Sequence, residues 1–142
     1  MIKIREIKDQ HEMENFYPLI RQLNPGLSRQ RYKKMLNDMV KAGYRMAAAY
    51  ESASCIGVSG FWIATKIYCG KYVEIDNLVI DKQHRSKGTG KKLCDFILRL
   101  ARKSGCETAM LDAYAENSLA HRFYYREGFI VRGFHFIKKL QM

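Results

Sequence analysis

The sequence predicts a mixed α/β (α+β) fold, in which a mostly antiparallel central sheet is flanked by about four helices. Patterns typical of strands and helices follow one another in the order strand, two helices, three strands, helix, strand, helix and strand. The three consecutive strands are separated by short turns, and such neighbours pair in antiparallel fashion. With 142 residues, 47% of them apolar, the chain can fill one core, so we expect a single domain over residues 1–142.

The N-terminal part predicts a strand followed by a helix. Isoleucines interspersed with charged residues over residues 2–7 are typical of a short strand. Asp9 and Glu12 then have the spacing of a capping box, in which each side chain accepts a hydrogen bond from the other residue's backbone amide. We expect the helix that they open to run to about Leu23.

A second helix and a hairpin follow. Ser28 is a suitable N-cap for the second helix, and Gly43 is a suitable stop. Two β-rich runs, Tyr44–Glu51 and Cys55–Thr65, are separated by the turn residues Ser52–Ser54, which predicts an antiparallel hairpin.

The next strand carries an irregularity. Along Tyr72–Ile80 the apolar side chains change from odd to even positions. Because side chains alternate strictly between the two faces of a strand, the change requires either a bulge near Asp76–Asn77 or a passage from a half-buried to a fully buried strand. A bulge would leave backbone amides available for other contacts.

The C-terminal part predicts two helices and further strands. Leu93–Ala101 has helical apolar spacing, Thr108–Ala113 is typical of a strand, and Asn117–Glu127 is typical of a helix that ends before a glycine. Phe129–Val131 and Phe134–Ile137 predict a final strand or hairpin.

Composition narrows the classes of protein. Twenty-five basic residues against 14 acidic ones give a net charge of +11, which attracts polyanions. The basic residues are scattered, however, so we do not expect a nucleic-acid interface. Apolar stretches such as Cys55–Thr65 are shorter than the ~20 residues that a membrane helix needs. The first residues lack the apolar core of a secretory signal, so we expect a cytoplasmic protein without a membrane partner.

The cysteines and histidines do not form a metal-binding pattern. Cys55, Cys69, Cys94 and Cys106 lie far apart, with no Cys-x-x-Cys pair and no histidine close by. We expect free thiols and no metal.

A glycine-containing segment between a strand and a helix predicts an anion-binding site. Residues 85–90 precede the helix directly, and the unpaired amides and the dipole at a helix N-terminus attract anions. Gly88 and Gly90 would let a phosphate approach the backbone. Three cationic side chains surround the same point: Arg85, Lys87 and Lys91.

Two common nucleotide motifs do not fit this segment. A P-loop requires glycine where Arg85 stands and serine or threonine where Lys92 stands. A dinucleotide fingerprint directly follows the opening strand of a parallel βαβ unit, whereas several antiparallel strands come first here.

The segment instead resembles a family motif. Arg85-Ser86-Lys87-Gly88-Thr89-Gly90 is similar to the Q/R-x-x-G-x-G/A signature of the GNAT superfamily of N-acetyltransferases. A second segment resembles that family's N-x-x-A-x-x-x-Y-x-x-x-G-F pattern through Asn117, Ala120, Tyr124, Gly128 and Phe129. The resemblance is strong over residues 72–130.

The resemblance implies a sheet splayed between its fourth and fifth strands, with acetyl-CoA lying in the opening. Backbone groups of the fourth strand would pair with the pantetheine amides, and the amides of residues 86–91 would hold the pyrophosphate. The implied cofactor-binding residues are Leu78, Val79, Ile80, Arg85, Ser86, Lys87, Gly88, Thr89, Gly90, Lys91, Asn117, Ala120 and Tyr124.

The resemblance also implies catalytic roles. Tyr124 matches the tyrosine that protonates the departing thiolate, and a phenol with a pKa of about 10 is chemically suited to that step. Asp76 is our first candidate for the base that deprotonates the amine, and Glu74 is the second. A backbone amide at Leu78 or Val79 would stabilise the oxyanion. Reserve candidates are Tyr125 for the acid, and His84 and His121 for the base.

The expected function is therefore the transfer of an acetyl group from acetyl-CoA to a primary amine by direct attack. The alternative is a module of the same fold that binds acyl-CoA without turnover, or that binds nucleic acid through its basic surface. The sequence does not identify the acceptor: amino acids, polyamines, antibiotics and protein amines all stay open, and so does a longer acyl group. A homodimer through the final strands is compatible with the pattern.

Overall fold

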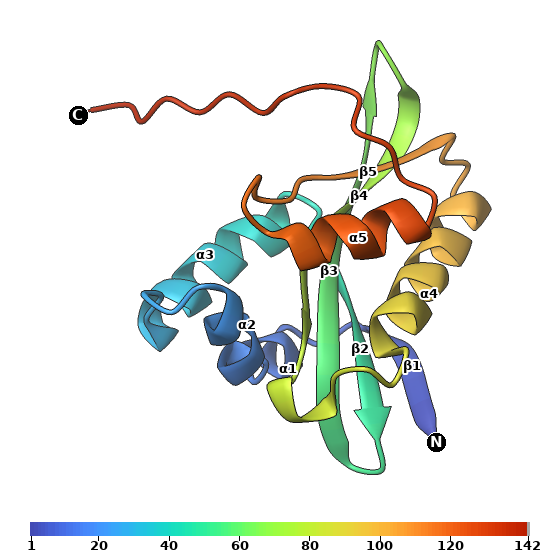
Figure 1. The fold of residues 1–142 in the computed structure, drawn as a ribbon. Coiled ribbons are helices and arrows are strands. Elements are labelled where there is room, and N and C mark those ends of the chain that lie inside the picture. Colours follow the sequence, from blue (N-terminus) through green and yellow to red (C-terminus); the bar gives the residue numbers. More distant parts are fainter. Residues whose placement is uncertain (142) are drawn as a thin grey trace. The chain divides into compact units, whose positions relative to one another are not determined.

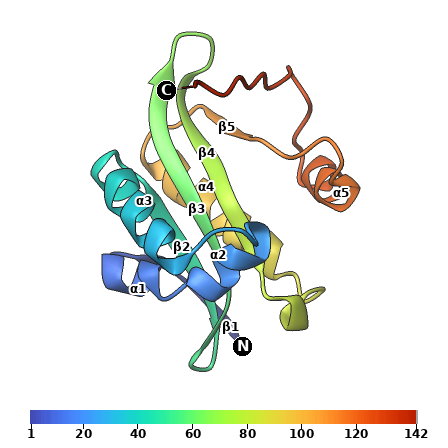
Figure 2. The ribbon, with the colours of Figure 1, turned by 90° about the vertical axis from the view of Figure 1, so that its left-hand side faces the viewer.

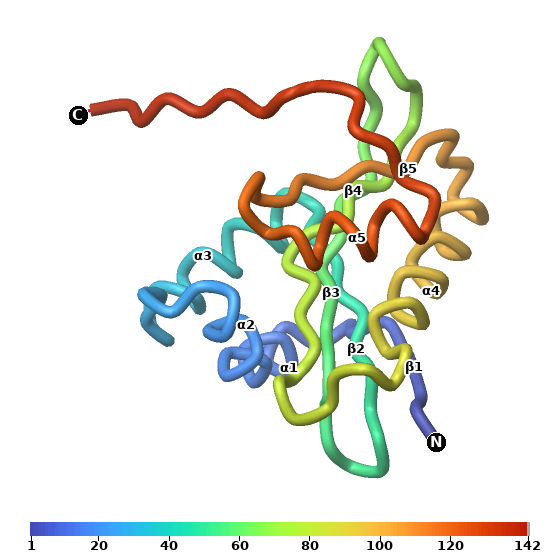
Figure 3. Tube along the Cα trace, in the orientation of Figure 1, coloured from blue at the N-terminus to red at the C-terminus, as the bar shows by residue number. Residues whose placement is uncertain are grey.

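The computed structural model describes residues 1–141, which form two compact units, residues 1–110 and the remainder from Leu111 onward (Figures 1 and 3). The expected single domain over residues 1–142 stays a prediction. The elements in chain order are β1 (Ile2–Ile7), α1 (Gln10–Glu14), α2 (Tyr17–Leu23), α3 (Arg29–Lys41), β2 (Arg45–Glu51), β3 (Ser54–Lys66), β4 (Gly70–Ile80), the 3-10 helix η1 (Lys82–His84), α4 (Thr89–Lys103), β5 (Thr108–Leu111) and α5 (Ser118–Arg126).

The five strands form one mixed sheet in the order β1-β2-β3-β4-β5. The first four strands pair in antiparallel fashion with their chain neighbours, and β5 lies parallel to β4. The predicted α/β fold with a mostly antiparallel sheet is confirmed, as is the β2–β3 hairpin.

Helices cover both faces of the sheet in the first unit. The helix α4 lies on one face, and α1, α2 and α3 lie on the opposite one (Figures 1 and 2). The middle strand β2 is therefore buried on both sides: Met46 and Ala48 belong to the core under α1–α3, while Ala47 and Ala49 are equally buried on the other face.

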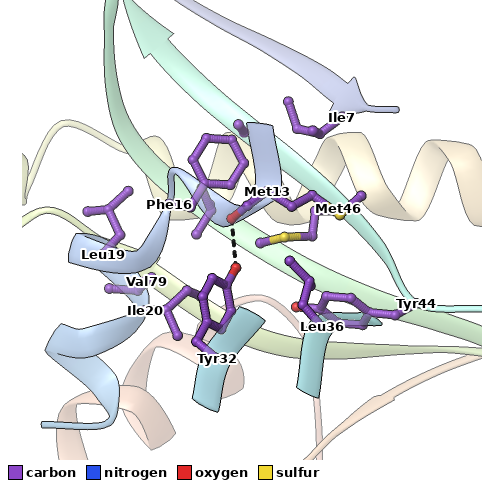
Figure 4. Packing of buried hydrophobic residues seen from close by; sticks show 12 residues of the cluster. Ile7, Met13, Phe16, Leu19, Ile20, Tyr32, Leu36, Tyr44, Met46 and Val79 are labelled. Carbon is purple, nitrogen blue, oxygen red and sulfur yellow. Dashed lines mark hydrogen bonds between the residues drawn. The ribbon is translucent and has the colours of Figure 1, made fainter. Parts of the chain in front are cut away.

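The core under α1–α3 fixes these helices on the sheet (Figure 4). The Tyr32 hydroxyl of α3 donates a hydrogen bond of 2.8 Å to the backbone oxygen of Met13, so a buried polar group is satisfied there. The other side chains of this core are apolar or aromatic: Ile7, Phe16, Leu19, Ile20, Leu36, Tyr44, Met46, Ala48, Val58 and Val79.

The single N-terminal helix expected from Asp9 to Leu23 is divided in two. The helix α1 ends at Glu14, with Asn15 as its C-cap, and α2 begins at Tyr17 with Pro18 in its first turn. Proline has no amide to donate in a helix interior and clashes with the preceding turn, but it fits a first turn well. Pro18 therefore favours a new helix over the continuation of α1.

The expected capping box is half correct. Asp9 caps α1 by accepting a hydrogen bond from the His11 amide at 2.9 Å. Glu12, however, does not return to the Asp9 amide, because its carboxylate accepts from the Arg5 guanidinium and the Tyr50 hydroxyl instead. These partners, Arg5 first, hold the pKa of Glu12 below its usual range.

The second unit contains α5 but not the final strand that the sequence predicted. Within the described chain, residues 129–141 form no helix or strand, so the expected strands Phe129–Val131 and Phe134–Ile137 are wrong. A strand needs a neighbouring backbone, and none of the backbone hydrogen bonds in residues 1–141 involves residues 130–141.

No helix in the described part of the chain is both long and apolar enough to span a bilayer. The cytoplasmic location and the homodimer stay predictions.

Candidate active site

The strand β4 contains the predicted bulge. Val58 pairs with Val79 and Gly60 pairs with Asp76, so Ser59 alone faces two residues of β4, Asn77 and Leu78. Asn77 has a φ of 55°, a left-handed conformation that asparagine adopts more readily than most residues.

The bulge explains the parity change in the sequence. Before it, buried Val73 lies beside residues of α4. After it, Val79 lies in the core under α1–α3, while Ile80 approaches Gly57 on the side of Leu93 in α4. The extra residue therefore moves the apolar row that faces α4 from odd to even positions.

Asp76, the first candidate for the base, is half-buried and held by an indole. Its Oδ2 atom accepts a hydrogen bond of 3.0 Å from Nε1 of Trp62 on β3. The Trp62 ring in turn packs on Tyr44, with ring centroids 5.1 Å apart. Because an indole nitrogen only donates, this contact orients the carboxylate and leaves its other oxygen to accept a proton.

Glu74, the second candidate, lies two residues before Asp76 and so on the same face of β4. It is half-buried and stands opposite Trp62 in the strand register. Sequence reasoning named both acids but missed their aromatic neighbours. The hairpin register could have indicated them, since it places Trp62 diagonally across from Asp76.

The strand β5 is too short to pair with the last residues of β4. The Glu107 amide donates to the Lys71 oxygen at 2.7 Å, just before β5 begins. Counted in parallel register from this bond, which places Glu107 level with Tyr72, the four residues of β5 reach no farther than the level of Asp76. The short strand thus leaves the outer edge of residues 78–80, where the sequence placed the pantetheine contacts, outside its reach.

The segment between β4 and α4 has the backbone of an anion cradle. Ser86 and Gly88 have φ values of 68° and 75°, and Gly88 is the N-cap of α4. Within residues 1–141, no backbone hydrogen bond is donated by the amides of residues 86–90. Since α4 is 15 residues long, its dipole adds positive potential at this end.

Thr89 adds a donor to the cradle. This first residue of α4 is only 2% exposed, and its hydroxyl has no hydrogen-bond partner among the described residues. Buried hydroxyls are nearly always paired, so a partnerless one beside unpaired amides fits a phosphate-bearing ligand.

The three cations around the cradle are arranged less simply than expected. Arg85 is exposed, whereas Lys87 lies 3.2 Å from the Glu51 carboxylate and Lys91 lies 3.3 Å from the Asp95 carboxylate. The Lys87 ammonium holds the pKa of Glu51 below its usual range. Exposed ion pairs of this kind are weak, so both lysines can still turn toward an anion.

The remaining predicted residues belong to the second unit. Asn117 caps α5, accepting a hydrogen bond of 3.1 Å from the Ala120 amide. Tyr124 is half-buried, and its ring contacts those of Phe123 and Phe129, with centroids 5.3 and 5.9 Å away. The contributions of Asn117, Ala120 and Tyr124 to cofactor binding and catalysis stay predictions.

The reserve candidates have other contacts. The Tyr125 side chain is 57% exposed, the His121 ring nitrogen lies 2.8 Å from the Tyr114 oxygen, and His84 lies 3.3 Å from the Asp81 carboxylate. Across residues 1–141, no three histidine, cysteine or acidic side chains group as metal ligands would.

A bulged fourth strand, followed by a helix whose N-terminal amides are unpaired among the described residues, defines an α/β protein with a candidate anion site. The chain belongs to the GNAT family of acetyltransferases, because the model of the Acetyltransferase (GNAT) family matches residues 9–129. The resemblance noted in the sequence is thereby confirmed, and the chain is an acetyltransferase enzyme.

Similar proteins agree with this assignment. An uncharacterized N-acetyltransferase of Bacillus subtilis, YhdJ, is 31% identical over 140 residues, which cover 97% of this chain and 99% of that protein. Among solved structures, aminoglycoside N-acetyltransferase AAC(6')-Iy in complex with CoA has a TM-score of 0.86 at 18% identity, covering 100% of this chain and 96% of that one. Glucosamine-6-phosphate N-acetyltransferase of Arabidopsis thaliana has a TM-score of 0.75 at 23% identity, with 99% of both chains covered. These structural likenesses establish the fold.

Proposed function

We propose that this enzyme transfers the acetyl group of acetyl-CoA to a primary amine of a small molecule. The observation that carries the proposal is that the β4 bulge occurs together with the cradle at the start of α4. The amides of the cradle and the Thr89 hydroxyl have no partner among the described residues and can donate to an anion. The solved complexes of AAC(6')-Iy with CoA and with a bisubstrate analog support it, as properties of that protein.

In this proposal the residues of the cradle hold the pyrophosphate. The amides of residues 86–90 donate to its oxygens, the Thr89 hydroxyl adds one more donor, and Arg85 and Lys87 supply positive charge. The backbone of Leu78–Ile80 pairs with the pantetheine amides, as an added strand would.

The chemical step needs a base, an oxyanion donor and an acid. Asp76, oriented by Trp62, takes a proton from the ammonium of the acceptor, and the free amine attacks the thioester carbonyl to form the C–N bond. The amide of Leu78, beside the bulge, donates to the oxyanion. The oxyanion collapses, the C–S bond breaks, and Tyr124 gives its phenolic proton to the departing thiolate. The attached nitrogen then loses its second proton, which returns through solvent to the Tyr124 phenolate and leaves a neutral amide.

The test combines binding with turnover. Calorimetry with acetyl-CoA should show saturable binding, and a panel of amino sugars, aminoglycosides, polyamines, amino acids and peptides should reveal amine-dependent release of free thiol. Absence of saturable binding at millimolar acetyl-CoA would refute the proposal. Binding without turnover for any amine would leave the non-catalytic alternative.

The role of Asp76 is tested by a matched pair of variants. Asp76→Asn keeps the shape of the side chain but removes the base, so kcat should fall about a hundredfold or more with little change in acetyl-CoA affinity. Asp38→Asn removes an exposed carboxylate on α3 and should leave kcat unchanged. Equal kcat values for Asp76→Asn and Asp38→Asn would show that Asp76 is not the base, and would leave Glu74 as the remaining carboxylate candidate.

A further inference from the structure

We propose that Tyr44 is a positioning residue whose hydroxyl fixes the β4 bulge through Asn77, and thereby sets the direction of the amides that follow the bulge. The kinetic part of this inference rests on the proposed acetyl transfer. Its structural part does not, because the contacts join residues of the free protein.

The first contact is between the bulge and the core. Asn77, the residue with a φ of 55°, donates from its side-chain nitrogen to the Tyr44 hydroxyl at 3.2 Å. Tyr44 is 4% exposed and lies in the core under α1–α3. A left-handed residue persists only where its surroundings hold it, and this hydrogen bond joins it to a buried ring of the core.

The second contact explains how a tyrosine reaches the bulge. A Cβ atom on Gly60 would lie only 1.9 Å from the Tyr44 hydroxyl oxygen, so the ring occupies space that any larger residue would fill. Gly60 is the partner of Asp76 in the register, directly beside the point where the pairing shifts. The glycine therefore lets Tyr44, the residue before β2, place its hydroxyl against the bulge across β3.

The same cluster also holds the carboxylate. The Tyr44 ring packs on Trp62, and Trp62 donates to Asp76. One aromatic pair therefore supports both groups whose relative position matters for the proposed reaction: the carboxylate before the bulge and the backbone amides after it. Small displacements of such groups cost large factors in rate, since a shift of about 1 Å is worth up to about a hundredfold.

The test is a double-mutant cycle. Tyr44→Phe removes the hydroxyl, and Asn77→Gly removes the amide while tolerating a positive φ. Each should lower kcat about tenfold to a hundredfold, with the dissociation constant of acetyl-CoA changed by less than about threefold. Because both act through one hydrogen bond, the double variant should be no slower than the worse single variant. Additive losses would overturn the inference.

The control separates positioning from stability. Tyr32→Phe removes another buried hydroxyl, the one that donates to Met13 at 2.8 Å, and should lower Tm without lowering kcat. A loss of kcat as large as that of Tyr44→Phe would show that any buried hydroxyl in this core has the same effect, which contradicts a specific role.

A readout without turnover keeps this inference distinct from the proposed function. In amide NMR spectra of the free protein, Tyr44→Phe and Asn77→Gly should both shift the Leu78 and Val79 resonances, and Tyr32→Phe should not. If the wild-type enzyme acetylates no amine, the proposed function fails. The spectra still show whether the hydrogen bond between Asn77 and Tyr44 fixes the backbone of the bulge. Unchanged Leu78 and Val79 resonances in a folded variant would overturn it, and Asn77→Gly serves if Tyr44→Phe does not fold.

Discussion

The Thr89 hydroxyl, which has no hydrogen-bond partner among the described residues, should lower the stability of the free protein relative to a variant without it. Thr89 is 2% exposed, and its hydroxyl has no partner among the described residues. Thr89→Val replaces that hydroxyl with a methyl group of nearly the same shape, and the two residues have similar helix propensities. The substitution should therefore stabilise the free protein and weaken the binding of acetyl-CoA.

The magnitude follows from the burial. Leaving a buried hydroxyl without a partner costs about 1–3 kcal/mol, and removing it recovers a part of that cost. We expect a gain of about 1–2 kcal/mol, which corresponds to a rise in Tm of about 3–10 °C for a chain of this size. With acetyl-CoA present, the loss of a hydrogen bond to a charged phosphate costs about 1.5–3 kcal/mol, or roughly a tenfold to hundredfold weaker affinity.

Thermal unfolding followed by circular dichroism, with and without acetyl-CoA, measures both effects. The matched control is Ser59→Ala, because the Ser59 hydroxyl is fully buried but donates to the Gly60 oxygen at 3.1 Å. That variant should be less stable than wild type. A lower Tm for Thr89→Val in the free protein, together with unchanged acetyl-CoA affinity, would refute the reasoning.

Three further predictions concern catalysis, packing and pH. Tyr124→Phe should lower kcat while leaving calorimetric affinity for acetyl-CoA nearly intact, and unchanged turnover would remove it from the acid role. Gly60→Ala, whose Cβ would lie 1.9 Å from a tyrosine oxygen, should reduce the free energy of unfolding by roughly 1–3 kcal/mol and so lower Tm, whereas Gly26→Ala, with nothing within 4 Å, should not; equal Tm values would contradict the contact. The Arg45 guanidinium donates hydrogen bonds of 2.8 and 3.0 Å to Glu6 and lowers the pKa of that carboxyl. The ion pair therefore contributes to the free energy of unfolding above the unfolded pKa of about 4.3, and this contribution is lost as pH falls through the lower folded pKa. Between about pH 5 and 3 the Tm of wild type should therefore fall more steeply than that of Glu6→Gln, and parallel curves would refute this.

The parts of the fold that the sequence predicted correctly depend on local signals. Ser28 caps α3 by accepting a hydrogen bond from the Arg31 amide at 3.1 Å, as its position before a helical pattern predicted. The parity change in β4 indicated a bulge as one of two explanations, because alternation is a local geometric rule, and the register shows that the bulge is present. The division of the first helix could also have been predicted, since Pro18 stands in the sequence, but our prediction of one helix to Leu23 did not take the proline into account.

The parts that the sequence did not predict depend on partners distant in the chain. The contact between Trp62 and Asp76 requires the β3–β4 register, which is fixed only once the turn and the bulge are both known. The final strand was predicted from the β propensity of residues 129–137. Propensity of this kind reports that a segment suits a sheet, and it does not supply the neighbouring backbone that a strand requires.

The inserted residue in β4 also explains why the two candidate acids and the pantetheine edge can share one strand. In a regular strand, Val73 and Ile75 would face the same side as Val79, so an apolar face toward α4 would continue on the odd positions. With Asn77 inserted, that face continues on the even positions, as the approach of Ile80 toward Leu93 shows. Asp76 lies before the bulge at an even position, so it faces away from α4, on the side of the indole that holds it. The single extra residue therefore moves the apolar row that faces α4 to even positions and brings Val79 into the core under α1–α3, while Asp76 keeps the face that it has in a regular strand. The carboxylate and the irregular backbone thus lie next to each other on β4, which is why we assign the chemistry to this point of the sheet.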